Sequence, residues 1–292
     1  MAFFKGITVW LWTAALVGIG AHAQVFNPGP PQVDLSGDWA ANYSEDEPER
    51  IPGPELGDYL GIPLNVAARF AAETWDASLL TVPEYQCRVH PSDYVPQFSD
   101  IRIWREVDPV TQQLVAFHTH VTWFGTERTI WMDGRPHPSA HALHTSQGFS
   151  TGKFEGGILT ISTTHLKRAW IRRNGVPRSE NATVVEHLIR HGNHLTWMTV
   201  ITDPAYLTEP MVRSRDFTLN LNGQMAPYPC ESVVEVVRPR GQIPHHLPGT
   251  NTFLKEFQQK HGIPADAAMG GAETMYPEYQ LKLRALLKTA SK

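Results

Sequence analysis

The stretch QLVAFHTHVTWF, residues 113–124, decides the fold class of this chain of 292 residues. Its β-branched and aromatic side chains alternate between two faces, with Phe117 and Val121 on one and His118 and His120 on the other. Successive side chains of a β-strand point to opposite faces, and branched and ring side chains favour strands. The stretch therefore predicts a strand that presents both histidines on the same side.

Further short runs of the same kind lie on both sides of this stretch. They cover residues 101–107, 128–132, 158–164, 183–191, 195–202 and 232–238. Turn dipeptides such as Asp133-Gly134 and Asn174-Gly175 separate them. Strands at this spacing, with no helices between them, predict a mainly β protein with an antiparallel sheet that closes into a barrel or folds into a sandwich.

Helical patterns lie near the two ends of the chain, at residues 65–73, 253–261 and 278–288. Proline-rich stretches at residues 51–54 and 238–248 are typical of ordered connectors. We expect the helices to cover an open end or a face of the barrel. The predicted organisation is an extension with a first strand and a short helix (24–100), a β-barrel core (101–240), and a connector with helices (241–292).

The first 23 residues have the three parts of a secretory signal peptide. Lys5 supplies a positive charge, residues 7–20 form an uncharged apolar run, and Ala21-His22-Ala23 is a small-x-small cleavage site. The run is short for a bilayer span. We therefore predict a mature protein that starts near Gln24, is periplasmic or secreted, and has no stable membrane span; an uncleaved anchor is the alternative.

The chain has two cysteines, Cys87 and Cys230. An even number in an exported protein is consistent with one disulfide, which predicts a bond between them. Two independent buried thiols are the alternative, because the sequence gives no distance between the sulfur atoms.

The formal net charge is -4, and no block of lysines and arginines stands out. The one cationic cluster, made of Lys167, Arg168, Arg172 and Arg173, is interrupted by apolar residues. This pattern argues against a nucleic-acid partner. It favours a solvated loop, with an anion site as the alternative. The sequence lacks the motifs of serine hydrolases, P-loop proteins, zincins and dinucleotide-binding folds.

Histidines supply the candidate site. If His118 and His120 share a face, Glu186, His187 or His137 would be the residues to complete a site for a divalent transition metal. The preferred interpretation uses His118, His120, His137, Arg135 and Glu186 as acid–base groups with no cofactor.

Two of these candidates also have plain structural interpretations. Prolines flank His137 and restrict its backbone, as a preorganised site requires. Arg135, two residues earlier, is equally consistent with an ion pair to Asp133 or Glu155 that braces the turn. Glu186 is similarly consistent with a charge ladder to Arg190.

Rings are abundant in the predicted strands, and Trp123, Phe124, Trp131 and His187 are the candidate ligand-binding residues. A cavity lined by some of them favours a small aromatic or apolar molecule with a few polar anchors.

Two sets of residues carry a resemblance to known proteins. Leu35-Ser36-Gly37-Asp38-Trp39 resembles the Gly-x-Trp start of the first strand in lipocalin-like (calycin) barrels. The segments DGRPHP (133–138) and STGKFEG (150–156) resemble a family of secreted bacterial proteins frequent in sphingomonads and acidobacteria. The resemblance implies an antiparallel lipocalin-like β-barrel and export, and it brings no catalytic residue with it.

Together these patterns predict a periplasmic or secreted barrel that binds a small aromatic or apolar molecule. Buried ionisable groups favour acid–base chemistry of the lyase, isomerase or hydratase type. A non-catalytic carrier and a metal-dependent His-x-His enzyme are the alternatives. No sequence pattern indicates an oligomeric state.

Overall fold

The computed structural model describes residues 33–43, 54–97 and 99–290. The predicted signal peptide and its cleavage site lie outside these residues, so processing stays a prediction. Within the described part of the chain, every helix is too short or too polar to cross a bilayer.

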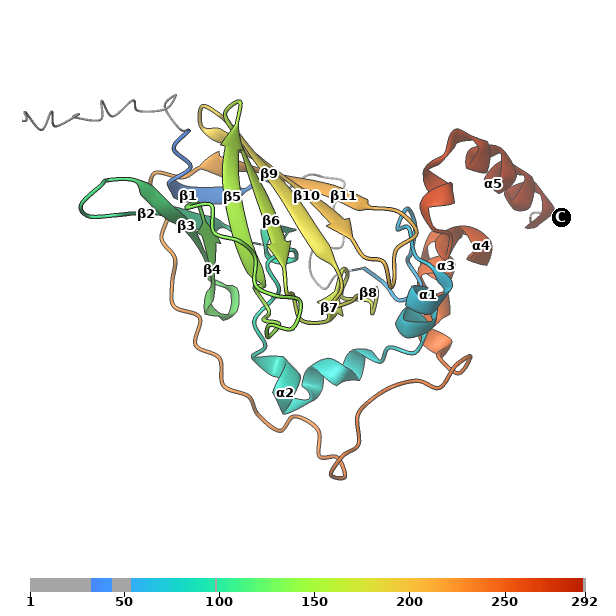
Figure 1. Ribbon diagram of the computed structural model, residues 1–292. Helices are drawn as coiled ribbons and strands as arrows, with labels where there is room; N and C mark the ends of the chain where they lie inside the picture. Colours follow the sequence, from blue (N-terminus) through green and yellow to red (C-terminus); the bar gives the residue numbers. More distant parts are fainter. Residues whose placement is uncertain (1–32, 44–53, 98, 291–292) are drawn as a thin grey trace, which may run out of the picture. The chain divides into compact units, whose positions relative to one another are not determined.

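Nine strands close into a barrel (Figure 1). In their order around it they are β1 (Gly37–Ala41), β11 (Met211–Leu219), β10 (His194–Thr202), β9 (Thr183–His191), β6 (Ile158–Thr164), β5 (Phe149–Glu155), β4 (Thr126–Trp131), β3 (Leu114–Val121) and β2 (Ile101–Val107). Pairing of β1 with both β11 and β2 closes the ring. The mainly β barrel predicted from the sequence is therefore confirmed.

One pair of neighbours departs from the antiparallel pattern. Strands β4 and β5 run parallel, with Ile130 opposite Ser150, and residues 132–148 carry the chain back to the starting end. Parallel neighbours need such a long connection, whereas antiparallel neighbours can be joined by a tight turn. The predicted DGRPHP turn lies in this crossover and does not join a hairpin.

Strands β2, β6 and β9 have the bounds that the sequence predicts, but β3 ends earlier than expected. The chain leaves the strand at Thr122 and forms a 3-10 turn, η3 (Trp123–Gly125), in which Phe124 has a φ of 55°. Trp123 and Phe124 are consequently displaced from the two strand faces. Their rings lie beyond the end of β3.

The strand predicted at residues 232–238 is wrong. Residues 222–250, which we call the strap, form no strand, and most of their side chains are exposed. The closed barrel leaves no free edge with which this segment can pair. Its valines therefore follow the outside of the molecule, although their composition is typical of a strand.

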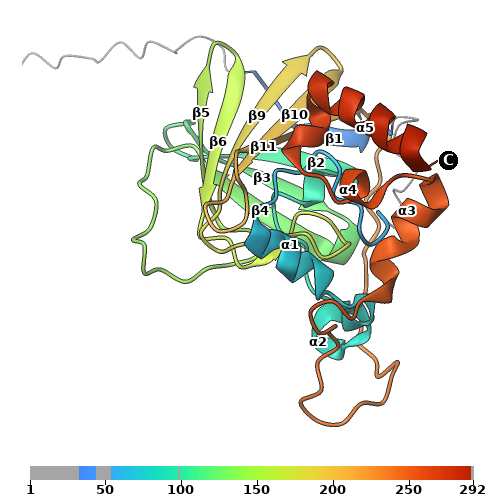
Figure 2. The same ribbon diagram turned by 90° about the vertical axis from the view of Figure 1, so that its right-hand side faces the viewer.

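Helix α1 (Val66–Glu73) forms where the sequence predicts it, because the Asn65 side chain accepts from the Ala68 amide and caps its first turn. Its buried face, Ala68 and Ala72, joins an apolar cluster with Leu166 and Ile201. This cluster closes one end of the barrel (Figure 2). A second apolar cluster, which includes Trp39 and Phe117, fills the barrel itself.

Further short elements extend from the barrel. They are η1 (Ala77–Thr81), α2 (Pro83–Gln86), η2 (Val95–Gln97), the β7 (Ala169–Trp170) and β8 (Pro177–Arg178) hairpin, η4 (Thr252–Lys255), α3 (Glu256–His261), α4 (Ala265–Ala268), η5 (Ala272–Met275) and α5 (Pro277–Ala290). Elements η4, α3 and α5 match the two helices predicted near the C-terminus.

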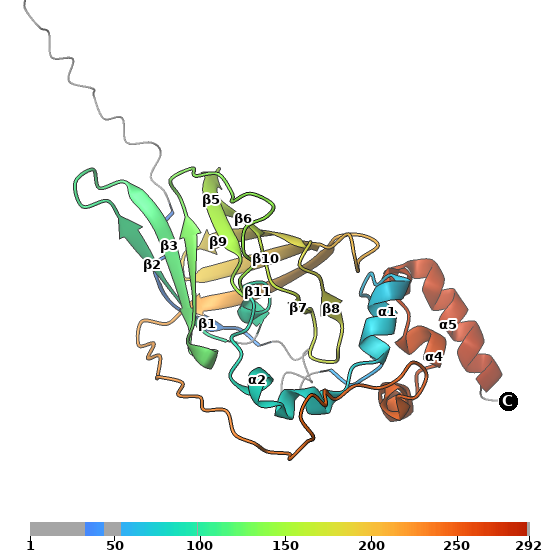
Figure 3. The same ribbon diagram turned by 60° about the horizontal axis from the view of Figure 1, so that its bottom comes forward.

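Cys87 and Cys230 form a disulfide with their Cα atoms 5.7 Å apart, as the paired count predicts. The bond ties the strap to the residue that follows α2. Figure 3 shows the strap passing along α2 before it reaches the C-terminal helices. This exposed segment is thereby held against a part of the molecule that contains a cavity.

Candidate functional site

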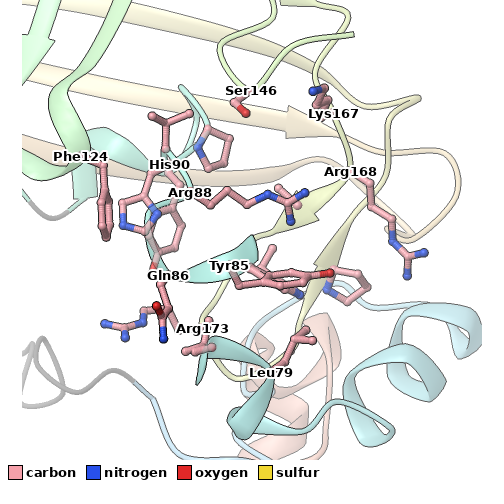
Figure 4. A pocket seen from close by; sticks show the side chains of 18 of the residues that line it. Leu79, Tyr85, Gln86, Arg88, His90, Phe124, Ser146, Lys167, Arg168 and Arg173 are labelled. Carbon is pink, nitrogen blue, oxygen red and sulfur yellow. The ribbon is translucent and has the colours of Figure 1, made fainter. Parts of the chain in front are cut away.

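A cavity of about 650 Å³ lies beyond the end of the barrel at which β3 and β6 finish. Five separate segments supply its walls: residues 71–94, η3, the crossover at Ser146, residues 167–177 with the β7–β8 hairpin, and the strap at Glu235. Figure 4 shows several of these side chains around the space. Ligand sites for small molecules commonly have volumes of about 300–1,000 Å³. The cavity has the size of a binding site for a small organic molecule.

Aromatic rings form much of the wall. Trp170 makes an edge contact with Trp75 at 6.2 Å between ring centroids and lies 6.0 Å from Tyr85. In a second group of rings, His90 lies 5.1 Å from Tyr94 and 5.2 Å from Phe124, measured between ring centroids. Flat apolar surfaces of this kind favour a ligand with an aromatic or otherwise apolar body.

Local backbone geometry brings two of these rings into the wall. Phe124 adopts its left-handed conformation immediately before Gly125, where β3 turns into β4. Gly175 has a φ of +93°, and a Cβ atom there would lie 2.5 Å from the Cβ of Trp75. Glycine is therefore required at position 175, both for the turn and for the close approach of the β7–β8 hairpin to Trp75.

Four cations line the cavity: Arg88, Lys167, Arg168 and Arg173. Among the described residues none of the four forms an ion pair with a carboxylate. The Arg88 guanidinium lies 4.8 Å from the centre of the Tyr85 ring and crosses the middle of the cavity in Figure 4. The lining also includes Glu235, which accepts a hydrogen bond from the Gln86 amide.

His90 is neutral at physiological pH. Burial, with a smaller contribution from the positive charge of Arg173, lowers the pKa of its imidazole to about 4. Burial also raises the pKa of the neighbouring Tyr94 hydroxyl. The polar groups in this part of the wall are thus uncharged, while the positive charge lies on the arginine and lysine side chains.

The lowered pKa of His90 predicts that stability falls in acid. Between about pH 6.5 and pH 4 the unfolded chain binds a proton at this imidazole that the folded chain does not, so the unfolding free energy decreases as the pH falls. At pH 4.5 this effect is worth about 2 kcal/mol relative to pH 7. Urea unfolding at both pH values should show this loss in the wild type and a smaller loss in His90→Gln. Equal losses in the two proteins would contradict the assignment.

The strap closes one side of the cavity. The Tyr228 ring stacks on Trp123 at 5.7 Å between centroids and meets Phe124 edge-on at 5.2 Å. Two residues further, Cys230 is bonded to Cys87, next to the cavity residue Arg88. The disulfide and these ring contacts hold part of the wall in place.

His118 and His120 share one face of β3, as predicted, but this face lies on the outside of the barrel. On β3 the side chains of Phe117, Thr119 and Val121 are buried, and His118 and His120 lie between them on the outer face. The His118 Nε2 atom lies 2.7 Å from Glu106, and the His120 Nδ1 atom lies 3.5 Å from Glu127. Each histidine thus has a carboxylate partner, and neither lines the cavity.

Arg135 and His137 also have local partners. Arg135 pairs with Asp133 and lies over the Trp131 ring, with its guanidinium carbon 3.4 Å from the ring centre. The His137 ring nitrogens lie 2.7 Å from Thr164 Oγ1 and 2.9 Å from Thr151 Oγ1, and burial followed by the nearby His165 lowers the pKa of His137. These contacts match the structural interpretation of the turn.

Glu186 is the one predicted acid–base residue inside the barrel, with none of its side chain exposed. It pairs with Arg128 of β4 and accepts a hydrogen bond of 2.9 Å from the Trp197 indole. Arg128 also donates to Ser150 and Thr163. The charge ladder with Arg190 does not form, because Arg190 donates to backbone carbonyls at the barrel rim.

The remaining candidates are divided between the cavity and the outer face of the barrel. Trp123 and Phe124 line the cavity. Trp131 lies under Arg135, and His187 makes a contact of 3.0 Å with Thr160 Oγ1 on the outer face. Within the described ranges, no three His, Cys, Asp or Glu side chains come close enough to share a metal ion. The third ligand for the metal alternative is therefore not found near His118 and His120.

Several cavity residues escaped the sequence patterns, among them Trp75, Tyr85, Arg88 and His90. They lie outside the predicted strands, where alternation carries no information. The one available signal was the cationic cluster, of which Lys167, Arg168 and Arg173 line the cavity. The preferred interpretation of that cluster as a solvated loop overlooked the rings that the fold brings next to it.

Comparison with known proteins adds a distant likeness only. No protein-family model and no curated protein matches the sequence. Among solved structures, a point mutant of the fluorescent protein UnaG aligns with 9% identity over 63% of this chain and 95% of its own, at a TM-score of 0.27. The wild-type UnaG structure aligns with 7% identity over 64% and 97%, also at 0.27. The functional argument therefore depends on the geometry of the cavity.

Proposed function

We propose that this protein binds a small molecule with an aromatic or apolar body, and that its binding site is the cavity at the end of the barrel. The observation that carries the proposal is a space of about 650 Å³ whose wall holds two groups of contacting rings, Trp75 with Trp170 and His90 with Phe124. Around Glu186 the inside of the barrel is filled by side chains of the protein itself. This favours the end cavity, and not the inside of the barrel, as the ligand-binding site.

Export is part of this proposal. The predicted leader at residues 1–23 directs the chain out of the cytoplasm, and the Cys87–Cys230 bond supports that location because disulfides persist in oxidising compartments. The resemblance to secreted bacterial proteins points to the same location.

Acid–base catalysis is the second candidate function. The five residues that the sequence predicts for it do not gather at the cavity, but His90 is a neutral imidazole in the cavity wall. A neutral imidazole is able to accept a hydrogen bond from a bound molecule, but a pKa of about 4 lies far below the neutral pH at which a general base works well. His90 is therefore better suited to anchor a polar group of the ligand than to remove a proton from it.

Filling the cavity tests the proposal. N-phenyl-1-naphthylamine, an uncharged aromatic dye that fluoresces in apolar surroundings, should bind the wild type at one site. Ala71 lines the cavity from α1, so Ala71→Trp should occupy the space and weaken binding about tenfold or more.

Val66→Trp provides the matched control, since Val66 lies on the same helix and is 84% exposed. This variant should bind the dye like the wild type, and both variants should be checked for an unchanged melting temperature without dye. Undiminished binding by a folded Ala71→Trp variant would place the dye elsewhere and overturn the proposal.

A further inference from the structure

We infer that the natural ligand of the cavity is an organic anion, a ring-bearing or apolar body with an acidic group. The inference rests on the proposed function, because it assigns a charge to the molecule that the cavity binds. Its basis is the set of four cations in the wall, Arg88, Lys167, Arg168 and Arg173, against the single lining carboxylate of Glu235.

Within residues 167–178, some of the cationic side chains pair with a carboxylate and others do not. Arg172 pairs with Asp58 at 3.0 Å, and Arg178 pairs with the fully buried Asp93 at 3.0 Å. Lys167, Arg168 and Arg173 belong to the same segment, yet within the described part of the chain no carboxylate pairs with them. Arg178 is buried and Arg172 is half-buried, so both have carboxylate partners, whereas the three cations of the lining are exposed and are available to a ligand.

The charges of the lining do not cancel one another. Glu235 cannot balance the four cations, and its carboxylate already accepts from Gln86 at 2.8 Å.

Aromatic rings and cationic side chains lie next to each other in the cavity wall, and this indicates which kind of anion would bind. The Arg88 guanidinium is held over the Tyr85 ring, and Tyr85 in turn contacts Trp170. A small inorganic ion would leave the ring surfaces uncovered, whereas an uncharged apolar molecule would make no use of the positive potential of the four exposed cations. An aromatic or apolar acid with a carboxylate, sulfonate or phosphate satisfies both parts of the wall.

Two matched dyes test the charge. 8-Anilinonaphthalene-1-sulfonate has the ring system of N-phenyl-1-naphthylamine with a sulfonate added. At low ionic strength we expect the wild type to bind the sulfonate dye about tenfold more tightly than the uncharged dye. In about 1 M salt, where the Debye length is about 3 Å, the advantage should largely disappear.

Two double variants test whether the cations of the cavity cause the preference for the sulfonate dye. Arg88→Gln with Arg173→Gln should weaken binding of the sulfonate dye about tenfold and change binding of the uncharged dye by less than about twofold. The control is Arg105→Gln with Arg135→Gln, which removes two positive charges from side chains on the outer face of the barrel. It should leave both affinities unchanged.

The outcomes separate the two proposals. If the uncharged dye binds in the cavity and the sulfonate dye binds no better, or if both double variants weaken the sulfonate dye equally, the anion inference is overturned and the binding function stands. If Ala71→Trp leaves the sulfonate dye bound with full affinity, the anion site lies elsewhere and the inference is also overturned. If neither dye responds to Ala71→Trp, the proposed function itself fails.

Discussion

Replacing Glu186 by leucine is expected to destabilise the protein by about 3–5 kcal/mol. The carboxylate is fully buried, and Arg128, which pairs with it, has only 4% of its side chain exposed. Removing the carboxylate leaves the guanidinium charge inside the barrel with only the hydroxyls of Ser150 and Thr163 as hydrogen-bond partners. The Trp197 indole loses its acceptor as well. Urea unfolding at pH 7, followed by circular dichroism, measures the loss.

An exposed ion pair supplies the control. Asp133 and Arg135 form the same kind of pair at the barrel surface, with 35% and 37% of their side chains exposed. Asp133→Leu should cost at most about 1 kcal/mol, because solvent already screens this pair. The double variant Arg128→Met with Glu186→Leu should recover much of the stability that Glu186→Leu loses, since no buried charge remains. Similar losses for Asp133→Leu and Glu186→Leu would contradict a special cost of the buried charge.

Removing the disulfide is the second change with a large expected effect. The bond joins residues 143 apart in the sequence, and closing a loop of that length restricts the unfolded chain by about 5 kcal/mol. Changing both Cys87 and Cys230 to serine should therefore lower the unfolding free energy by about 4–5 kcal/mol. Urea unfolding of the oxidised wild type and the double serine variant measures the difference.

The reduced wild type distinguishes the effect of losing the disulfide from the effect of replacing cysteine by serine. With dithiothreitol present, it should unfold at nearly the same urea concentration as the double serine variant. A reduced wild type as stable as the oxidised protein would show that the closed loop does not limit the unfolded chain. In that case the stabilisation assigned to the bond would be wrong.

The sequence alone determined the features that depend on neighbouring residues. Alternation along the chain predicts β2, β6 and β9 with their observed bounds, and the helical spacing of residues 65–73 predicts α1. The shared face of His118 and His120 follows from the same alternation. These features are predictable because backbone geometry repeats every two residues in a strand and about every 3.6 residues in a helix.

Only the tertiary structure decided which face of each strand is inside. Outward His118 and inward Glu186 both occur in alternating strands, and because both faces of each strand carry polar as well as apolar residues, the pattern does not show which face is inside. Glu186 is accommodated inside because Arg128, 58 residues earlier, lies opposite it across the barrel interior. A partner at that separation is brought into place by strand pairing, which no local pattern encodes.

The cavity depends most on the tertiary structure. Arg88 follows α2, Phe124 follows β3, Trp170 lies in β7 and Glu235 lies in the strap, so that the wall joins segments almost 150 residues apart. Each residue alone has an ordinary surface or core interpretation. They meet because the barrel closes, Gly175 allows the hairpin to approach Trp75, and the disulfide holds the strap against α2. The sequence determined the strands by local geometry, whereas the binding surface exists only after long-range packing has brought its parts together.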